Sequence, residues 1–569
     1  MKLIIDGHEI EAQSGESLLD LIKRLGLDTD SLKTRPLAAD IDGEVFTLNY
    51  VPVRERESET TTYQMRRAMR KSKGVVKLIR YNDERGRNVY ERTMQFVFFL
   101  AVREVFKEAK VKVKFAIGAG IYVVIDKDSP LTEAEVELLN EKCAQIVQND
   151  YPLERKRLDI NEAIDFFERD GQQDKVRLLE WRNFTYFDVY RHGDYVDYFY
   201  GEMMPSTGYV SVMNLQYHAP GLYLVRPDKE DCDKPATEVD MPRFASVFEE
   251  SDRWGELMHC ETVADLNELT ASGGLRQLIR VNEALHERRF SEIATEIVNR
   301  GAMVVLIAGP SSSGKTTSAN RLATQLRVLG KSPILLSLDD YYIDRRLVLP
   351  DENGEIDLEH INTIDVAQFN TDLEALLNGK TVEIPFFNFK TGSREMRGHF
   401  VTLREDTPLI IEGLHALNPV LLNPRIDHSL VFRLYVSALT TLNIDNHNRI
   451  PTTDVRLLRR MVRDYETRGA SMERTLGMWE SVRRGEERWI FPYQEGADAI
   501  FNTTLVYELA VLKKHIYPLL RQIPPDSPCY DEIRTIIKFL NYIEDANVED
   551  EIPPTSILRE FIGGNTFYK

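Results

Sequence analysis

Hydrophobic and polar residues alternate at the start of the chain in a pattern that predicts two β-hairpins around a helix. "KLIIDGHEIEA" turns at Asp6-Gly7 and "PLAADIDGEVFTL" turns at Asp42-Gly43, and Asp-Gly is a strong hairpin signal. Between them, the apolar positions of "SLLDLIKRLGL" fall on one helical face. Residues 1–62 are therefore expected to form a small independent module.

A basic run follows and is interpreted as a linker over residues 63–84. Such a run is more often a solvated helix face or linker than a contact with RNA, but both interpretations stay open. Its basic residues are Arg66, Arg67, Arg70, Lys71, Lys73, Lys77 and Arg80.

Residues 85–226 have the pattern of a second, α+β unit. A helix is predicted over 90–110, a strand pair in "VKFAIGAGIYVVI" and an amphipathic helix in "TEAEVELLNEKCAQIVQ". Residues 227–300 begin polar and acidic and then become helical, so they are expected to be a connector and a helical spacer.

From Ala302 the hydrophobic pattern changes to short, continuous apolar runs. "MVVLIAG", "PILLSL", "PLIIEG" and "LVFRLYV" are typical of strands covered on both faces, and the first two are separated by a helical pattern that ends at Gly330. Alternating strands and helices predict a parallel α/β sheet over 301–525, followed by an extension over 526–569. The expected fold class is thus multidomain, α/β together with α+β.

Composition narrows the setting. The 569 residues predict three to five domains, and the net charge of −19 means that a polyanion must meet a local basic patch. The four cysteines form no CxxC pair, which argues against a disulfide framework or a cysteine zinc site. The chain starts without an apolar signal core and has no apolar run of membrane-spanning length, so a cytoplasmic protein without a membrane partner is expected.

"GPSSSGKTT" fits the phosphate-binding pattern GxxxxGK[ST], between a buried strand and a helix. In this pattern main-chain N–H groups converge on phosphate oxygens, the lysine reaches the β- and γ-phosphates and the hydroxyl after it binds Mg²⁺. We expect ATP and Mg²⁺ here. The predicted nucleotide-binding residues are Gly309, Ser311, Ser312, Ser313, Gly314, Lys315, Thr316 and Thr317.

Acidic residues end two of the predicted strands. Asp339 and Asp340 follow "LLSL", where a carboxylate can accept a proton from an attacking hydroxyl, although acidic pairs at strand ends are equally often caps. Glu412 ends "LIIE" and is suited to orient Mg²⁺ or its waters. Nine arginines between Arg456 and Arg488 are expected to include a lid that closes on phosphates, with ion pairs to neighbouring acids as the alternative.

Residues 302–520 resemble the uridine kinase and phosphoribulokinase family of P-loop kinases. The motifs, in order, are "GPSSSGKTT", "SLDDYY", "GEIDLEHINTIDVAQF", "LLNGKTVEIPFFNF", "LIIEGLHAL" and "RRMVRDYETRG". By this resemblance Asp339 is the general base, and Lys315 and Arg463 complete the catalytic set. Arg463 and Arg468 are lid arginines on the ATP phosphates.

The same resemblance places Asp339, Tyr342, Asp357, Phe387 and Arg460 around the acceptor, with Thr316 and Glu412 as the metal ligands. The family has a tyrosine and a histidine at two base-contacting positions, where this chain has Phe387 and Gly392. Phe387 can stack on a base but cannot donate a hydrogen bond, so the base specificity stays open.

The first half resembles parts of a different enzyme. Residues 1–62 are similar to a TGS domain, a β-grasp fold, and 85–226 resemble the editing domain of threonyl-tRNA synthetase, with "AIGAGIYVVI", "YRHGDYVDYFYGEMMPSTG" and "GLYLVR" in order. The His-xxx-His and Cys-xxx-His positions of that domain fall here on Arg92, Phe96, Phe199 and Met203. None of these can act as the original ligands, so we expect the fold without the editing chemistry.

These patterns favour an ATP- and Mg²⁺-dependent kinase that phosphorylates a hydroxyl of a nucleoside or small polyol. The alternative is a nucleotide-switched, translation-linked protein whose first half binds RNA or the ribosome. A third hypothesis makes the first half a sensor of a small regulatory ligand. Assembly into a homo-oligomer stays open.

Overall fold

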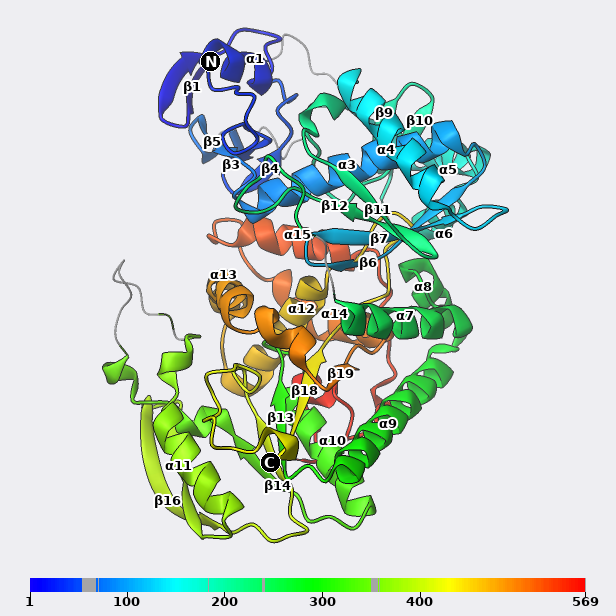
Figure 1. The fold of residues 1–569 in the computed structure, drawn as a ribbon. Helices are drawn as coiled ribbons and strands as arrows, with labels where there is room; N and C mark the ends of the chain where they lie inside the picture. The colour runs from blue at the N-terminus through cyan, green and yellow to red at the C-terminus, as the bar shows by residue number, and fades with distance from the viewer. Residues whose placement is uncertain are drawn as a thin grey trace.

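The computed structural model describes residues 1–53, 68–69, 71–182, 184–237, 241–348, 357 and 359–567. Figure 1 shows the N-terminal modules at one end of the molecule and a parallel sheet at the other, with the helices α7–α9 along one side.

The first module is a five-stranded sheet in the order β2-β1-β5-β3-β4, with α1 (Leu18–Arg24) packed on it. Both predicted hairpins are confirmed, because Ile5 pairs with His8 and Ile41 with Glu44. All four turn residues have positive φ, between 46° and 88°, as this hairpin turn requires. The strands are β1 (Lys2–Ile5), β2 (His8–Glu11), β3 (Ala38–Ile41), β4 (Glu44–Phe46) and β5 (Val75–Ile79).

The central strand of this sheet, β5, comes from the stretch that the sequence analysis assigned to a linker. That prediction is wrong for residues 75–79, which lie parallel to β1 and antiparallel to β3. Val76 and Leu78 are buried whereas Val75 and Lys77 are exposed, so a period of two was present beneath the basic composition.

The basic run is only partly described. Arg66, Arg67 and Arg70 lie outside the described residues. Lys71 forms an ion pair with Asp42 at 3.0 Å and Arg80 with Asp6 at 2.8 Å. These two cations are therefore paired within the first module.

The second module contains a four-stranded antiparallel sheet, β11-β12-β7-β6, and a three-stranded sheet, β10-β9-β8. The predicted helices and strand pair are present, and Thr132 caps α4 with a capping box. The helices are α3 (Glu84–Val105), α4 (Glu133–Gln148), α5 (Ile160–Arg169) and α6 (Gln173–Glu180). The strands are β6 (Lys110–Ile117), β7 (Gly120–Asp126), β8 (Glu154–Asp159), β9 (Tyr186–His192), β10 (Tyr195–Asp197), β11 (Asn214–His218) and β12 (Gly221–Val225).

Three helices connect this module to the parallel sheet, as the helical pattern predicts. The longest, α9 (Leu275–Arg300), packs against α10 (Lys315–Val328). The other two are α7 (Pro242–Leu257) and α8 (Val263–Ser272).

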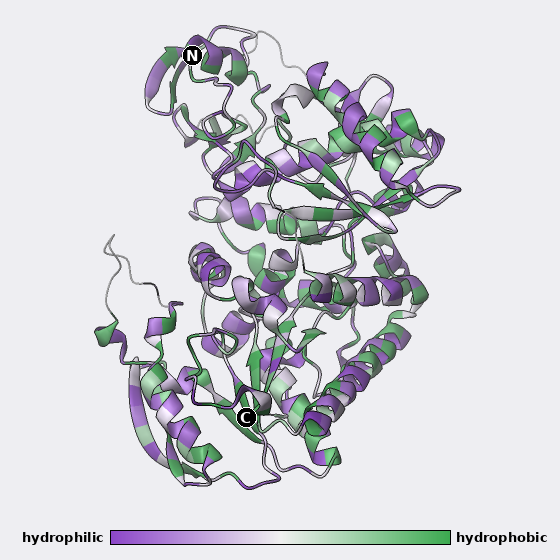
Figure 2. Ribbon diagram, viewed as in Figure 1, coloured by the Kyte–Doolittle hydropathy of each residue, from purple (hydrophilic) through white to green (hydrophobic). Residues whose placement is uncertain are grey.

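The C-terminal half is built on a five-stranded parallel sheet in the order β14-β17-β13-β18-β19. The four apolar runs form four of its strands, and every residue of β13 (Val304–Ala308) is buried. Figure 2 shows these central strands as hydrophobic, in contrast to the mixed surface of α9. The other strands are β14 (Ile334–Ser337), β17 (Leu409–Glu412), β18 (Val431–Ser437) and β19 (Ala499–Asn502).

The remaining elements surround this sheet. An antiparallel hairpin, β15 (Val382–Asn388) with β16 (Ser393–Val401), extends beside α11 (Val366–Leu377). The last helices are α12 (Thr452–Arg468), α13 (Met472–Trp489), α14 (Glu508–Leu520), α15 (Tyr530–Leu540) and α16 (Arg559–Ile562). Residues of the C-terminal extension, including Ile533, Leu558 and Phe561, belong to the same hydrophobic core as the parallel sheet.

Within the described residues, no helix combines the length and the apolar character needed to cross a membrane.

Candidate active site

The glycine-rich loop connects β13 to α10 and requires glycine at both motif positions. A Cβ on Gly309 would lie 2.0 Å from the carbonyl oxygen of Val436 on the neighbouring strand. Gly314 has φ +86°, which L-residues with side chains rarely adopt, and Ser312 is itself left-handed at φ 59°. The sequence motif therefore forms the tight turn that phosphate-binding loops need.

The loop carries several buried polar groups. The hydroxyls of Ser312 and Ser313 are buried and have no hydrogen-bond partner among the described residues. The ammonium of Lys315 donates to the carbonyl oxygens of Gly309 at 2.9 Å and Pro310 at 3.1 Å. Buried donors without partners, one lysine and a helix N-terminus fit a bound phosphate chain.

The positive charge of Lys315 is opposed by nearby carboxylates. Burial lowers the pKa of its ammonium, whereas the nearby carboxylates of Glu412, Asp339 and Glu560 oppose that effect. Lys315 is therefore held within electrostatic range of three acidic groups.

Two acidic residues meet at the carboxyl ends of adjacent strands. The strand register places Glu412 beside Ser337 and beside Ile307, two residues before the loop. Glu412 accepts hydrogen bonds from Thr316 Oγ1 at 3.4 Å and from Ser337 Oγ at 3.3 Å. Burial, and then the charge of Asp339, raise the pKa of Glu412 to about 7.

Asp339 lies in the short helical turn that follows β14. Its N–H is capped by Ser337 Oγ at 3.3 Å. Burial raises the pKa of Asp339, and the cations Lys315 and Arg468 partly oppose this shift. A half-buried carboxylate with a raised pKa beside the glycine-rich loop can accept a proton from a hydroxyl.

A cluster of three aromatic side chains forms the wall beyond Asp339. The rings of Tyr342, Phe387 and Phe389 meet edge to face, with centroids 5.1 to 6.3 Å apart. Phe387 lies on β15, and its N–H donates to Asp340 Oδ1 at 3.3 Å. The cluster brings two of the predicted acceptor residues together.

Asp357 lies beside the C-terminal end of α13. Its carboxylate accepts from Trp489 Nε1 at 3.2 Å and from the N–H of Glu359 at 3.0 Å. Burial raises the pKa of Glu359 to about 7, the largest opposing effect being that of Arg460. Neither Glu359 nor Trp489 was predicted, although Glu359 lies in the motif "GEIDLEHINTIDVAQF", from which only Asp357 was taken as a site residue.

The two predicted lid arginines, Arg463 and Arg468, share one carboxylate with Arg460, which was predicted to lie near the acceptor. Arg460, Arg463 and Arg468 form ion pairs with Asp464 at 3.2 to 3.3 Å. Arg460 also donates to Ser311 Oγ at 2.7 Å, so it touches the glycine-rich loop directly.

Other arginines of the segment are structural, as the alternative interpretation held. Arg456 donates to Glu486 at 2.6 and 2.7 Å, and Arg459 donates to Glu508 at 2.6 and 3.0 Å, all four side chains being buried. Both also donate to loop carbonyls, Arg456 to Ser311 and Arg459 to Ser312. They fix the shape of the loop from behind.

Gly392, where the family has a base-contacting side chain, closes the β15–β16 hairpin with φ +69°. A Cβ there would lie 2.8 Å from Cδ of Arg345. The position thus carries a backbone requirement in this chain.

The four editing-domain positions form a packed cluster. Phe96, Phe199 and Met203 are buried, with the two rings 6.0 Å apart. Arg92 donates to the carbonyl oxygen of Glu202 at 2.9 Å, and burial lowers its pKa. These side chains pack together instead of forming a ligand set.

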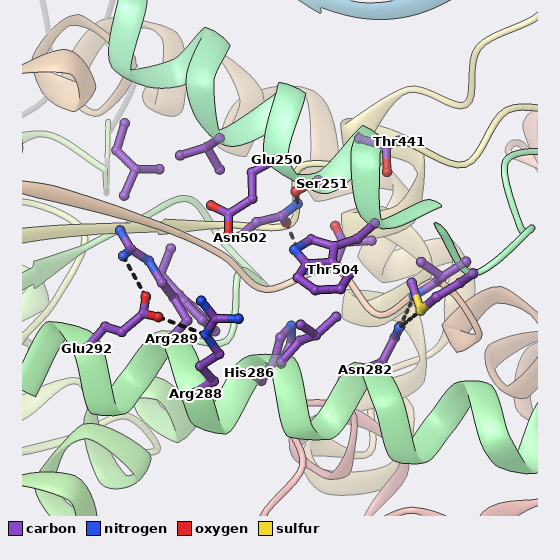
Figure 3. Close-up of a pocket in the computed structure, with 17 residues that line it drawn as sticks. Glu250, Ser251, Asn282, His286, Arg288, Arg289, Glu292, Thr441, Asn502 and Thr504 are labelled. Carbon is purple, nitrogen blue, oxygen red and sulfur yellow. Dashed lines mark hydrogen bonds and ion pairs between the residues drawn. The ribbon is translucent and has the colours of Figure 1, made fainter. Parts of the chain in front are cut away.

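A separate pocket lies between α7, α9 and β19 (Figure 3). Asn502 donates to Ser251 across it at 2.8 Å, and the ring of His286 lies 5.1 Å from that of Phe501. None of the predicted site residues lines this pocket. In the part of the chain that the structure describes, no group of three His, Cys, Asp or Glu side chains is arranged to hold a metal by itself.

A parallel sheet with a glycine-rich loop at the carboxyl end of its central strand defines the class of P-loop nucleotide-binding proteins. The model of the phosphoribulokinase/uridine kinase family matches residues 304–509. The uridine kinase of Staphylococcus aureus (strain JH9) is 30% identical over 202 residues, which cover 35% of this chain and 87% of that one. The chain belongs to the phosphoribulokinase/uridine kinase family.

The N-terminal region has a second similarity. The threonine–tRNA ligase of Clostridium kluyveri (strain NBRC 12016) is 28% identical over 211 residues, 37% of this chain. The chain spans only 30% of the length of that relative.

Among solved structures, a possible uridine kinase from Bacillus stearothermophilus is 22% identical with a TM-score of 0.26, covering 38% of this chain and 98% of that one. A putative fructose transport system kinase from Silicibacter sp. TM1040 is 20% identical with a TM-score of 0.28, covering 37% and 98%.

Proposed function

We propose that this protein transfers the γ-phosphoryl group of ATP to a hydroxyl of a nucleoside or a related small polyol. The observation that carries the proposal is the meeting of Asp339, Glu412 and Lys315 at the carboxyl ends of adjacent parallel strands, beside the glycine-rich loop. The similarity to the uridine kinase of Staphylococcus aureus supports a nucleoside as acceptor.

The roles of the side chains follow from their positions. Asp339 accepts the proton of the acceptor hydroxyl as the oxygen attacks. Lys315 and the loop N–H groups hold the phosphate oxygens, and Arg463 and Arg468 exchange Asp464 for phosphate as the lid closes. Thr316 and Glu412 would hold Mg²⁺, which neutralises charge on the transferred group.

The aromatic cluster and Asp357 suggest how the acceptor is held. The rings of Tyr342 and Phe387 pack edge to face, so a planar base would lie against this cluster, and the Asp357 carboxylate suits sugar hydroxyls. Because Phe387 has no polar group, base selection through this residue rests on stacking and shape, which discriminate weakly. We therefore propose a broad base specificity.

The experiment is phosphoryl transfer by Asp339→Asn. We expect ATP affinity within about threefold of wild type and turnover reduced by about 10²–10⁴-fold, the usual contribution of a general base. Asp427→Asn is the matched control, because this exposed residue caps a turn through Ser429 and asparagine caps equally well. Near wild-type turnover by Asp339→Asn would refute the assignment.

A second function, nucleotide-switched binding of RNA by the N-terminal half, gains no specific contact in its favour from the described residues.

A further inference from the structure

A segment of the C-terminal extension lies directly on the glycine-rich loop. A Cβ on Gly314 would lie 2.7 Å from Cγ2 of Ile557. The ring of Phe561 lies 5.1 Å from the guanidinium of Arg459, the residue that holds the Ser312 carbonyl. Residues 556–562 therefore pack against the loop at Gly314 and against the arginine that holds the loop at Ser312.

Within this segment, Glu560 occupies the N-terminus of α10. Its carboxylate accepts hydrogen bonds from the N–H of Thr317 at 3.2 Å and from Thr317 Oγ1 at 2.7 Å. Thr317 is the third residue of α10, and the first N–H groups of a helix point out of its N-terminus. In phosphate-binding loops these N–H groups, at the positive end of the helix dipole, cradle the α- and β-phosphates.

The segment that carries Glu560 is firmly anchored. Ile557, Leu558 and Phe561 are completely buried in the core of the parallel-sheet half. Ser556 donates to Glu283 of α9 at 2.5 Å. Nearer its start, Glu551 pairs with Arg276 at 2.7 Å.

Because of these anchors, the Glu560 side chain can move without movement of the segment that carries it. Releasing the segment would expose several apolar side chains, whereas the half-buried Glu560 can move away from Thr317 by rotating about its own χ angles. Displacing the carboxylate alone is therefore the easier change.

We propose that Glu560 is a built-in competitor of the nucleotide: its carboxylate holds the phosphate-binding N–H of Thr317 until a polyphosphate displaces it. The inference rests on the proposed function, because it assigns a regulation to the same loop. A carboxylate and a phosphate oxygen cannot share one N–H donor, and both are negative, so the two states exclude each other. The measured affinity for ATP is then the intrinsic affinity multiplied by the fraction of molecules in which Glu560 has moved away.

The experiment measures affinity of the full-length chain for Mg·ATP, pyrophosphate and adenosine by calorimetric titration. In Glu560→Gln, we expect the dissociation constants for Mg·ATP and pyrophosphate to fall about tenfold, because a neutral amide is a weaker acceptor and does not repel phosphate. The constant for adenosine, which has no phosphate, is expected to stay within twofold.

Asp550→Asn is the matched control. It makes the same change of charge in the same C-terminal extension, but its carboxylate is exposed and pairs with Arg276. We expect its Mg·ATP affinity to stay within twofold of wild type. Glu560→Asp is a second test variant, in which the shortened side chain keeps its charge but loses reach to Thr317, so an intermediate tightening is expected.

Equal or weaker Mg·ATP binding by both Glu560 variants, in chains whose unfolding temperatures match wild type, would overturn the inference. An equal tightening by Asp550→Asn would also overturn it, since the effect would then be one of net charge. If wild type binds ATP but phosphorylates no alcohol, the proposed function falls and the inference stands. If Asp339→Asn behaves as expected and Glu560→Gln changes nothing, only the inference falls.

Discussion

The buried ion pair behind the glycine-rich loop leads to a quantitative prediction. Arg456 and Glu486 have side chains only 1% and 2% exposed and are joined at 2.6 Å. Arg456 also donates to the carbonyl oxygen of Ser311 at 3.0 Å, and Glu486 accepts the N–H of the same residue at 2.9 Å. Ser311 is thus held through both of its backbone polar groups.

Replacing Arg456 by methionine fills most of the volume but leaves the Glu486 carboxylate buried without its cation. Removing one partner of a buried pair costs about 3–5 kcal/mol of the free energy of unfolding.

The assay is urea unfolding followed by intrinsic tryptophan fluorescence, comparing variants that share one m-value. The matched control is Arg484→Met, because Arg484 pairs with Glu480 at 2.7 Å with side chains 57% and 84% exposed. That exposed pair should contribute no more than about 0.5 kcal/mol.

A double variant, Arg456→Met with Glu486→Met, separates the unpaired charge from the lost packing. It removes both charges and leaves the Ser311 N–H without the Glu486 acceptor and the Ser311 carbonyl oxygen without the Arg456 donor, at about 1–3 kcal/mol for each unsatisfied group. We expect it to be more stable than the single variant. If Arg456→Met costs as little as Arg484→Met, or if the double variant is no more stable than the single one, the reasoning about the buried pair is wrong.

Two further perturbations test the charge distribution. Because burial raises the pKa of Glu412 to about 7, the contribution of Glu412 to stability is full below about pH 4.5 and is lost as the pH rises toward 7. Binding of Mg·ATP near pH 6 should therefore release a proton from Glu412. Calorimetry in buffers of different ionisation enthalpy measures the number of protons released. Glu412→Gln should reduce that release by up to one proton, and an unchanged number would contradict the assignment. Lys175 lies 3.1 Å from Asp197 and 3.9 Å from Asp445, all three buried, so Lys175→Met should cost about 3–5 kcal/mol. Lys142→Met is its control, since Lys142 pairs with Glu104 at the surface of the same module, and equal losses would refute the argument.

The features that the sequence predicts well are determined by neighbours along the chain. The Asp-Gly turns require positive φ at adjacent residues, and the glycine-rich loop needs glycine where a Cβ would meet Val436. Local backbone geometry and the identity of one or two residues are enough in these places.

The features that it misses depend on distant partners. β5 was taken for a linker because its pairing with β1 closes a loop of some seventy residues, which no local pattern encodes. Glu560 contacts Thr317 across 243 positions, and nothing in "SILREFI" marks a side chain that binds a loop. The arginine-rich segment was predicted to be a mixture, and the contacts of Arg456 with Glu486 and of Arg459 with Glu508 identify two structural members. That Arg463 and Arg468 close on phosphates stays a prediction.

The contacts of the site also explain how a chain of net charge −19 can hold a polyphosphate. Arg460, Arg463 and Arg468 are paired with Asp464, and the Thr317 N–H with Glu560. Arg460 and Arg463 are largely buried and would be costly without a partner, so these internal carboxylates stabilise the site while no nucleotide is bound. Binding then exchanges the internal ion pairs for ion pairs with phosphate. The binding free energy is the difference between the free energies of these two sets of interactions.

A singly charged anion gains little from such an exchange, because it replaces a tethered carboxylate at one point and loses its own hydration. A triphosphate would replace both carboxylates, those of Asp464 and Glu560, in one binding event. These acidic groups lower the affinity for every phosphate-containing anion. They lower it less for longer phosphate chains than for singly charged anions, so they make the site selective for the longer chains. On this reasoning Asp464 and Glu560 contribute to selectivity through the anions that they exclude.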